Sequence, residues 1–258
     1  MKLSKKIGLI TCVFMQLQLS AQHSPFRLGF QISPGVAWMT TNDLGVTNVG
    51  SNLTMGISAR GEIGISDRLS ATTGAGLTFN RGGTLRHETG GNFFPESRLS
   101  NGDYNSGQKP LPDGTKLKYR LQYVEIPVAL KWYVYEDKVL RYFAEAPVIT
   151  WGVTVRRRGA IDAGEIHVDN EDISKDVNPF NIILGFGGGV EYTVGSKTSV
   201  VAGLSFHRGL IDVTNNAATR ATHNPDNNPF DPNDDYILSP EDARAVLNAF
   251  VIRMGILF

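Results

Sequence analysis

The strongest constraint on the fold is an alternation of apolar and polar side chains with a period of two residues. Between residues 69 and 80, for example, Leu69, Ala71, Leu77 and Phe79 alternate with serine, threonine, asparagine and glycine. This period is typical of a β-strand with one apolar face. The pattern predicts eight strands, at approximately residues 27–38, 52–65, 69–80, 117–134, 140–155, 179–194, 198–210 and 248–258.

The connections between the predicted strands alternate in length. The long ones are residues 39–51, 81–116, 156–178 and 211–247, and the short ones are residues 66–68, 135–139 and 195–197. Short periplasmic turns at one rim and long extracellular loops at the other are typical of an up-and-down antiparallel barrel in an outer membrane. A β-sandwich does not require this segregation. In the last loop, Ser239, Pro240 and two acidic residues form a helix-start pattern, which predicts a short helix over residues 240–246.

The polar faces of the strands distinguish a membrane barrel from a soluble one. In the second, third and sixth predicted strands, these faces are mainly Gly, Ser, Thr and Asn, and the charged residues are Arg60, Glu62 and Glu191. A soluble, lipocalin-like barrel, the alternative, turns its apolar face inward and needs a strongly charged exterior. Small uncharged residues instead suit the narrow interior of an eight-stranded barrel whose apolar face contacts lipid. We therefore predict an all-β, eight-stranded antiparallel up-and-down transmembrane β-barrel.

The N-terminal segment is predicted to be a secretory signal peptide. Three lysines precede an apolar stretch at residues 7–19, and the small residue Ala21 follows it. The stretch is too short to span a bilayer as a helix, and the order of charged, apolar and small residues is that of a cleaved signal. The predicted domains are the signal peptide, residues 1–21, and the outer-membrane barrel, residues 22–258.

Charge and cysteine content exclude several classes of function. The 25 Lys and Arg residues balance 25 Asp and Glu residues, which argues against a nucleic-acid partner. Cys12 is the single cysteine and lies within the predicted signal peptide, so the mature chain has neither a disulfide scaffold nor a thiolate metal site. The sequence also lacks a phosphate-binding glycine loop and a zinc-protease motif. We expect no cofactor.

Three prolines fall inside predicted strands, where proline removes a hydrogen bond from the ladder. Near Pro127 the apolar positions shift by one residue, from the series that ends at Tyr123 to the series that begins at Val124. This shift predicts a β-bulge beside Pro127. We also expect local bulges at Pro34 and Pro147.

Charged side chains on the polar faces are predicted to fill the barrel interior. They are Arg60, Glu62, Arg120, Glu125, Lys131, Glu191, His207 and Arg253. Removing a partner from a buried ion pair is strongly destabilising, so charges in a narrow interior have to be paired. The main hypothesis is a network of ion pairs that plugs the barrel, and the alternative is a small porin-like conduit.

One set of residues has the composition of a catalytic site. Ser205 and His207 point to the same side of one predicted strand, and Glu191 lies on the strand before it. Such a trio can activate a serine nucleophile, and outer-membrane lipid A deacylases carry a similar trio on their lipid-facing surface. Here the trio points into the lumen, away from acyl chains. We therefore predict no enzymatic activity, with a lipid-modifying hydrolase as the alternative.

The predicted extracellular side carries basic and aromatic residues. Arg156, Arg157 and Arg158 follow the fifth strand and are suited to pair with lipopolysaccharide phosphates; the alternative is a solvated rim. Five aromatic residues lie in the long loops: Phe93, Phe94, Tyr104, Phe230 and Tyr236. We expect them to pack the loops against one another, with docking of a partner as the alternative.

The last loop is rich in oxygen ligands. Among them are Asp226, Asp231, Asp234 and Asp235, whose carboxylates are suited to calcium. Their spacing matches no EF-hand, and Asn, Asp and Pro are common turn formers. We therefore predict a solvated loop without a metal, and calcium binding is the alternative.

Several of these segments resemble the PorT-like outer-membrane β-barrel family. Tyr123-Val124-Glu125-Ile126-Pro127, followed by Leu130-Lys131-Trp132-Tyr133, resembles the Tyr-x-Glu-Ile-Pro strand of that family. The glycine-rich residues 185–189, the strand end at 207–210 and the closing residues 253–258 are similar as well. The resemblance covers most of the mature chain. It implies an eight-stranded barrel of the outer membrane and little about activity.

The C-terminal residues Met254, Ile256 and Phe258 resemble the signal that the outer-membrane assembly machinery reads. The expected partners are this machinery, outer-membrane lipids, lipopolysaccharide and an envelope protein. The predicted function is a structural or interaction role through the extracellular loops of a plugged barrel.

Overall fold

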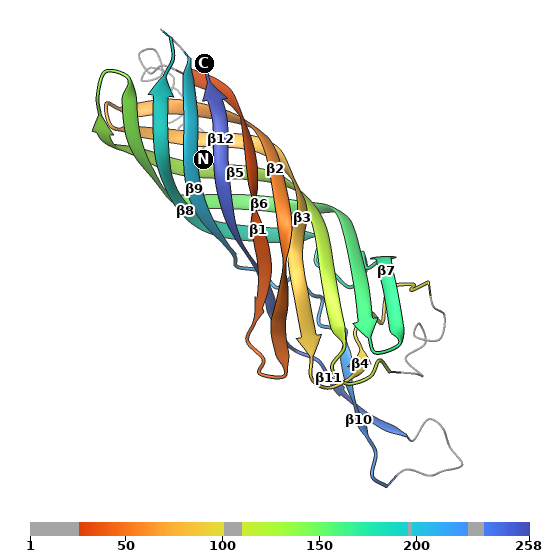
Figure 1. Ribbon diagram of the computed structural model, residues 1–258. Coiled ribbons are helices and arrows are strands. Elements are labelled where there is room, and N and C mark those ends of the chain that lie inside the picture. The colour runs from red at the N-terminus through yellow and green to blue at the C-terminus, as the bar shows by residue number, and fades with distance from the viewer. Residues whose placement is uncertain (1–25, 101–109, 196–197, 227–234) are drawn as a thin grey trace, which may run out of the picture.

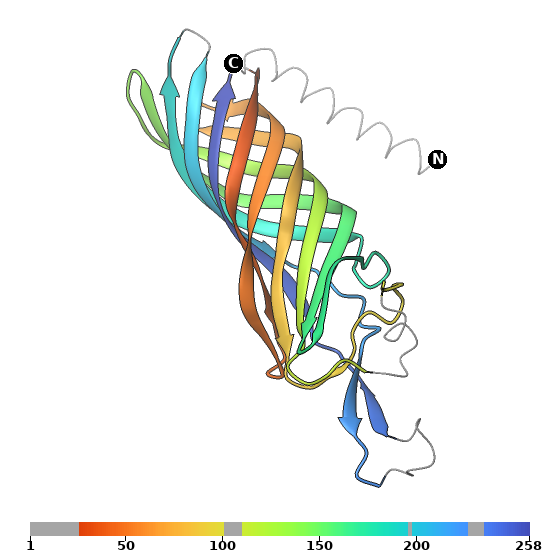
Figure 2. The same cartoon turned by 45° about the vertical axis from the view of Figure 1, so that its right-hand side comes forward.

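The computed structural model describes residues 26–100, 110–195, 198–226 and 235–258, and the predicted signal peptide lies outside them. Eight long strands form a barrel (Figure 1, Figure 2). They are β1 (Phe26–Thr41), β2 (Val46–Ser66), β3 (Leu69–His87), β5 (Lys116–Glu136), β6 (Leu140–Ala163), β8 (Phe180–Thr193), β9 (Ser199–Gly209) and β12 (Ala245–Leu257). In this part of the chain, no helix is long and apolar enough to cross a membrane.

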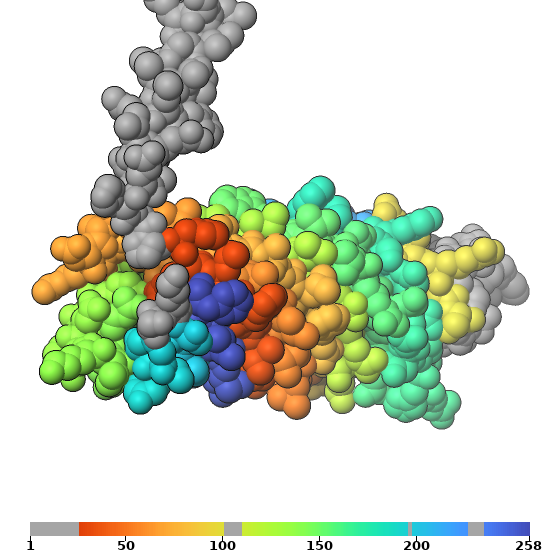
Figure 3. All heavy atoms as spheres, turned by 90° about the horizontal axis from the view of Figure 1, so that it is seen from above, coloured from red at the N-terminus to blue at the C-terminus, as the bar shows by residue number. Residues whose placement is uncertain are grey.

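The eight strands close into a ring of antiparallel neighbours. β1 pairs with β2 on one side and with β12, the last strand, on the other. Figure 3 shows β12, in blue, between β1, in red, and β9, in cyan. The ring continues from β9 through β8, β6, β5 and β3 back to β2. The predicted eight-stranded up-and-down barrel is confirmed.

The two ends of the barrel differ. The turn rim, as we name it, has the start of β1, the end of β12 and the short connections 67–68 and 137–139. The opposite end, the loop end, has the long connections. It also carries four further strands: β4 (Gly91–Asn92), β7 (Ile166–Asp172), β10 (Thr219–His223) and β11 (Tyr236–Pro240). β7 widens the barrel wall by pairing with β6, whereas β10 pairs with β4 and β11 in a separate small sheet.

A belt of exposed apolar side chains surrounds the barrel. Every strand of the ring contributes to it: Phe30, Ile57, Leu77, Ile126, Trp151, Phe186, Leu204 and Ile252 are each 45–66% exposed. Soluble proteins rarely expose an apolar surface of this extent, and outer-membrane barrels carry such a band against lipid. The protein is therefore a transmembrane β-barrel located in an outer membrane.

Toward the loop end, the strands run further than the sequence pattern predicts. The connection expected at residues 39–51 is mostly strand, because β1 continues to Thr41 and β2 begins at Val46. The helix predicted over residues 240–246 is wrong. Pro240 ends β11, and Glu241 accepts a hydrogen bond from the Ala243 amide at 3.2 Å instead of starting a helix.

The bulge predicted beside Pro127 is confirmed only in part, because the register of β5 with β6 shifts on either side of Pro127, between Gln122 and Tyr123 and between Ala129 and Lys131. Pro127 itself stands in register opposite Thr150, and the odd-numbered side chains of β5 from Leu117 to Tyr133 point inward. The apolar positions change faces because the surroundings change. Beyond Tyr123 toward the loop end, the interior of the barrel becomes a hydrophobic core and its exterior meets water.

Other irregularities lie elsewhere in the barrel wall. β3 shifts register between Thr78 and Arg81, where Asn80 adopts a φ of 59°. The expected irregularity at Pro147 is present, since β6 shifts register between Glu145 and Val148. Pro34 keeps its register opposite Met55, so no bulge occurs there.

Candidate functional site: charge clusters in the lumen and a folded cap

Charged side chains from five strands meet in the lumen at the turn rim. We name them the turn-rim cluster: Arg27 of β1, Glu62 of β2, Lys131 and Tyr133 of β5, Arg141 of β6 and Glu191 of β8. Lys131 Nζ lies 2.9 Å from Glu62 Oε2 and 2.8 Å from Glu191 Oε2. These side chains meet because alternate positions of each strand face the lumen.

Glu191 is the centre of the turn-rim cluster. It is fully buried and accepts hydrogen bonds from three cations, one each on β1, β5 and β6. The second carboxylate, Glu62, accepts from Arg27 at 2.7 Å and from the Tyr133 hydroxyl at 2.6 Å. Charges removed from water in this way are stable only while each keeps its partners. The cluster therefore sets paired charges across the lumen and ties five strands together.

A second group, the central cluster, lies further into the barrel. Glu145 of β6 pairs with Arg60 of β2 through Oε1, at 3.3 Å, and with Arg253 of β12 through its other oxygen. The ring of Phe143 connects the two clusters. Arg253 lies 5.7 Å and Lys131 4.5 Å from its centroid, and both contacts are of the cation–π type.

A third group, the upper cluster, lies nearest the loop end. Arg81 Nε is 3.3 Å from Glu125 Oε1, and Arg81 Nη2 is 3.2 Å from His207 Nδ1. Thr78 Oγ1 donates to Glu125 Oε2 at 2.8 Å. A cavity of about 70 Å³ borders the upper and central clusters, which leaves room for a few water molecules.

The structure places most of the predicted interior charges in these clusters: Arg60, Glu62, Glu125, Lys131, Glu191, His207 and Arg253. The prediction for Arg120 is wrong. Arg120 lies on the outer face of β5, with Nη1 2.7 Å from Asp169 Oδ1 of β7. The error follows from assuming that the apolar face of β5 meets lipid along its whole length.

Sequence reasoning missed several members of the clusters: Arg27, Arg81, Tyr133, Arg141 and Glu145. Arg27 and Arg141 were detectable, because both continue the polar alternation of their strands toward the turn rim. Arg81 was not, since the irregularity at Asn80 changes which side chains of β3 point inward.

The trio Ser205, His207 and Glu191 is not assembled. The inward face of β9 carries both Ser205 and His207, but the latter contacts Arg81, and Ser205 Oγ has no hydrogen-bond partner in the described part of the chain. Glu191 stands opposite Val201, four residues along β9 from Ser205, and is held in the turn-rim cluster. No carboxylate in this arrangement orients the histidine as a general base requires.

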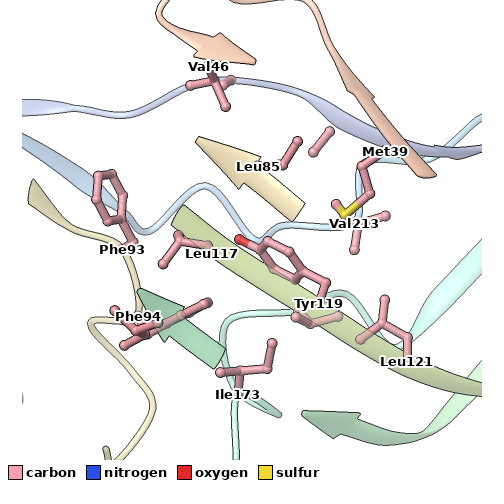
Figure 4. Close-up of a cluster of buried hydrophobic side chains, with 14 of the residues drawn as sticks. Met39, Val46, Leu85, Phe93, Phe94, Leu117, Tyr119, Leu121, Ile173 and Val213 are labelled. Carbon is pink, nitrogen blue, oxygen red and sulfur yellow. The ribbon is translucent and has the colours of Figure 1, made fainter. Parts of the chain in front are cut away.

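Above the lumen, the loop end forms a folded cap with its own hydrophobic core (Figure 4). Met39, Leu85, Leu117, Tyr119 and Ile173 point toward one another in it. The loop aromatics Phe93 and Phe94 are 4% and 2% exposed and belong to the same core, so they pack the loops as expected. Tyr104 and Phe230 lie outside the described residues, and Tyr236 is exposed.

Buried polar groups bind the long loops of the cap to one another. Asp176 Oδ1 accepts from the Glu96 amide at 3.1 Å, and the Asp176 carbonyl accepts from the Asn215 amide at 3.3 Å. Asn178 Nδ2 donates to the carbonyls of Asp212 and Thr214 at 2.8 and 2.9 Å. Three separate connections are thus held as one unit.

His87 is a buried titratable side chain of the cap. It is buried against the ring of Phe93, with 4.1 Å between the ring centroids. Burial and the positive charge of Arg220 lower the pKa of His87 to about 4, although Asp43 opposes this shift. His87 is therefore neutral in the folded cap at neutral pH.

The basic cluster at residues 156–158 is divided between the two faces of β6. Arg157 turns inward, where Nε donates to Thr154 Oγ1 at 2.6 Å and Nη1 donates to the carbonyl of Ser174. Arg156 is exposed, and Arg158 lies 4.0 Å from Asp172. Of the three arginines, Arg158 also donates to the carbonyl of Asn170 at 3.3 Å.

The calcium candidates are only partly described. Asp231 and Asp234 lie outside the described residues, and the Asp226 amide donates to the Asn224 side chain at 3.1 Å, as in an ordinary turn. Within the described ranges, no group of three or more His, Cys, Asp or Glu side chains is arranged to hold a metal.

The predicted assembly signal lies on the outer face of β12. Met254, Ile256 and Phe258 are 41–51% exposed and contribute to the apolar belt. Phe258 also exchanges two backbone hydrogen bonds with Leu28, at 2.7 and 2.9 Å, and so joins the end of the chain to β1.

Comparison with known proteins gives no close relative. No protein family matches the sequence, and no curated protein matches it. Among solved structures, the chain is similar to the outer membrane protease OmpT from Escherichia coli, with 9% identity, a TM-score of 0.45 and coverage of 92% of this chain and 96% of that one. Neisserial surface protein A has 10% identity, a TM-score of 0.41 and coverage of 92% and 98%. Ail of Yersinia pestis has 10% identity, a TM-score of 0.32 and coverage of 89% and 98%.

Proposed function

We propose that this protein is a plugged outer-membrane barrel that binds a partner protein through its extracellular cap. The observation that carries the proposal is the edge strand β11, at the end of the cap furthest from the turn rim (Figure 1). β11 pairs with β10 on one side and ends the small sheet on the other.

Among the described residues, no strand pairs with the free edge of β11, and this strand is also apolar. Tyr236, Ile237 and Leu238 are 44%, 54% and 54% exposed, and they are consecutive, so both faces of β11 present apolar surface. Natural proteins usually protect such an edge with charges or a covering segment, because it templates the addition of another strand. A partner that adds an extended segment to β11 would satisfy its backbone groups and cover these side chains.

A photocrosslinking amino acid at Ile237 tests this proposal in intact cells. We expect a discrete adduct with one envelope or external protein, and we expect Leu238→Lys to abolish it while the barrel still folds. The matched control carries the same crosslinker at Asp162, on the exposed outer face of β6. Equal adducts at both positions, or none at Ile237, would contradict the proposal.

The plugged interior is the second part of the proposal. The turn-rim and central clusters support it, because together they set ionic side chains of β1, β2, β5, β6, β8 and β12 across the lumen. Planar-bilayer recordings of the mature chain are expected to show no stable conductance steps. Large, regular steps would favour the porin-like conduit instead.

Three finer assignments belong to the same proposal. The Tyr-x-Glu-Ile-Pro strand supports membership in the PorT-like family. Arg156 and Arg158 support contact with lipopolysaccharide on the β6 side of the barrel. We propose no catalytic role. Unchanged lipid A acylation in a Ser205→Ala strain would agree with this, and altered acylation would favour the hydrolase.

A further inference from the structure

We propose that a groove on the outer surface of the barrel binds the phosphate of lipid A in the outer leaflet. The groove has a volume of about 320 Å³ and lies where β1, β9 and β12 reach the loop end. Thr40, Asn42, Arg208 and Arg244 line it. The inference depends on the orientation of the barrel and not on the proposed partner of β11.

Two guanidinium groups give the groove its chemistry. Arg208 is an exposed, outward-facing residue of β9, and Arg244 is exposed just before β12 begins. Arg244 is held in place, because its side chain donates to the carbonyl of Leu210 and its amide donates to Asn42 Oδ1 at 2.8 Å. In the described part of the chain, neither arginine forms an ion pair with a carboxylate.

Arginine suits a phosphate better than any other side chain, because its planar donors bind two oxygens at once. Two arginines in one groove without a carboxylate partner therefore favour an anion with several oxygens. The hydroxyl of Thr40 adds a polar group, and it already accepts a hydrogen bond from Asn248 Nδ2 at 3.0 Å. The charge of the groove is complementary to a phosphate monoester.

An aromatic patch below the groove identifies the anion as part of a lipid. Phe206 lies at its centre, with ring centroids 5.2 Å from Phe250, 5.7 Å from Phe186 and 6.2 Å from Trp38. Phe206 is two residues before Arg208 on the same face of β9, a rise of about 7 Å along the strand. The patch belongs to the apolar belt, so a ligand seated here meets cations above and acyl-chain surroundings below.

The position within the membrane narrows the choice of lipid. Long loops of outer-membrane barrels face the outside, and aromatic residues mark the level of the headgroups. The groove therefore lies at the outer leaflet, where lipid A presents its phosphates. A free phosphate ion would gain nothing from Trp38 and Phe206, whereas lipid A contacts both parts of the site.

Native mass spectrometry of the mature chain with diphosphoryl lipid A tests the site. The double variant Arg208→Gln/Arg244→Gln is expected to lose one bound lipid, with affinity at this site falling about tenfold or more. The matched control, Arg86→Gln/Lys116→Gln, removes the same charge from the neighbouring strands β3 and β5, further from the belt. It is expected to change affinity less than about twofold. Heat-dependent gel mobility establishes that each variant is folded.

Two further arms use the wild-type chain and so do not depend on how the variants fold. Dephosphorylated lipid A is expected to bind at least about tenfold more weakly than the diphosphoryl form. Inorganic phosphate at millimolar concentration is expected not to displace the lipid. Equal binding of both lipid forms, equal losses in the two double variants, or displacement by inorganic phosphate would overturn the proposal.

Discussion

The same strands build the barrel inside the membrane and the cap above it, but apolar and charged side chains exchange faces between the two regions. Along β5, the membrane half turns Lys131 inward and Ile126 outward, whereas the cap half turns Leu121 inward and Arg120 outward. The alternation of β5 continues through the crossover, although its register with β6 shifts there, between Gln122 and Tyr123. In β5 the same side of the strand faces the interior from Leu117 to Tyr133, whereas β3 changes the side that faces inward at Asn80.

The difference shows that the surroundings of a strand, rather than its backbone, determine which residue types face inward and which face outward. In lipid, the outer face must be apolar and the narrow interior takes paired ions. In water, apolar side chains are buried in the interior, as in soluble proteins. Different substitutions should therefore destabilise the two regions, and matched variants can test this.

The largest expected effect is the loss of the cap in Leu121→Asp. Leu121 is fully buried in the cap core, so the substitution places an unpaired carboxylate among apolar side chains and destabilises the cap by more than about 4 kcal/mol. Limited proteolysis of proteoliposomes should cleave the long loops, while the membrane half keeps its heat-dependent gel mobility.

The control for this prediction is Gln122→Asp, the next residue on the opposite face of β5, which should leave the cap resistant to protease. Loss of both the cap and the membrane half in Leu121→Asp would show that the two regions fold as one unit.

The next largest effect is expected for Glu191→Gln in the turn-rim cluster. Arg27, Lys131 and Arg141 would lose their shared carboxylate, and breaking a buried ion pair of this kind costs about 3–5 kcal/mol. Urea unfolding in lipid vesicles measures the loss. Glu136→Gln is the matched control, because Glu136 is 53% exposed and its Oε1 lies 3.8 Å from Arg141 Nη1, a long and weak ion pair. The loss of unfolding free energy in this control should be below about 1 kcal/mol. A similar loss in both variants would contradict the role of the buried cluster.

The sequence predicts the membrane half well, because lipid outside and small residues inside give each strand a clear period of two. Eight strands and most of the lumen charges followed from that period. The cap was harder, since its strands invert the pattern, and the prediction for Arg120 was wrong for this reason. Arg81 depends on the irregularity at Asn80, and no local pattern reveals that.

A smaller effect concerns pH and separates the cap from the membrane half. The pKa of His87 is lowered to about 4 in the folded cap, whereas it is about 6.5 in the unfolded chain. The neutral histidine therefore contributes its full stabilisation of the cap at pH values above about 6.5. That stability is lost as the pH falls from 6.5 toward 4, by roughly 2–4 kcal/mol. Buried Asp176 and Glu241 act in the opposite direction, because burial raises their pKa.

The variant His87→Phe isolates the histidine contribution, since it keeps the ring contact with Phe93 and removes the proton site. The difference in cap stability between wild type and variant, followed by hydrogen exchange, should change between pH 6.5 and 4. A difference independent of pH would contradict the assignment.

The smallest energetic effect is expected at Arg120, where the two possible orientations give opposite outcomes. The side chain is 33% exposed and pairs with Asp169, itself 67% exposed, so Arg120→Cys should cost less than about 1 kcal/mol. The thiol should react with a membrane-impermeant maleimide on intact cells, because it lies on the outer face of the cap wall. The thiol of Tyr119→Cys, one residue away, should remain unlabelled in the core. Labelling of the Tyr119→Cys variant but not of the Arg120→Cys variant would show that the other face of β5 points into the cap core. That result would contradict the orientation of Arg120.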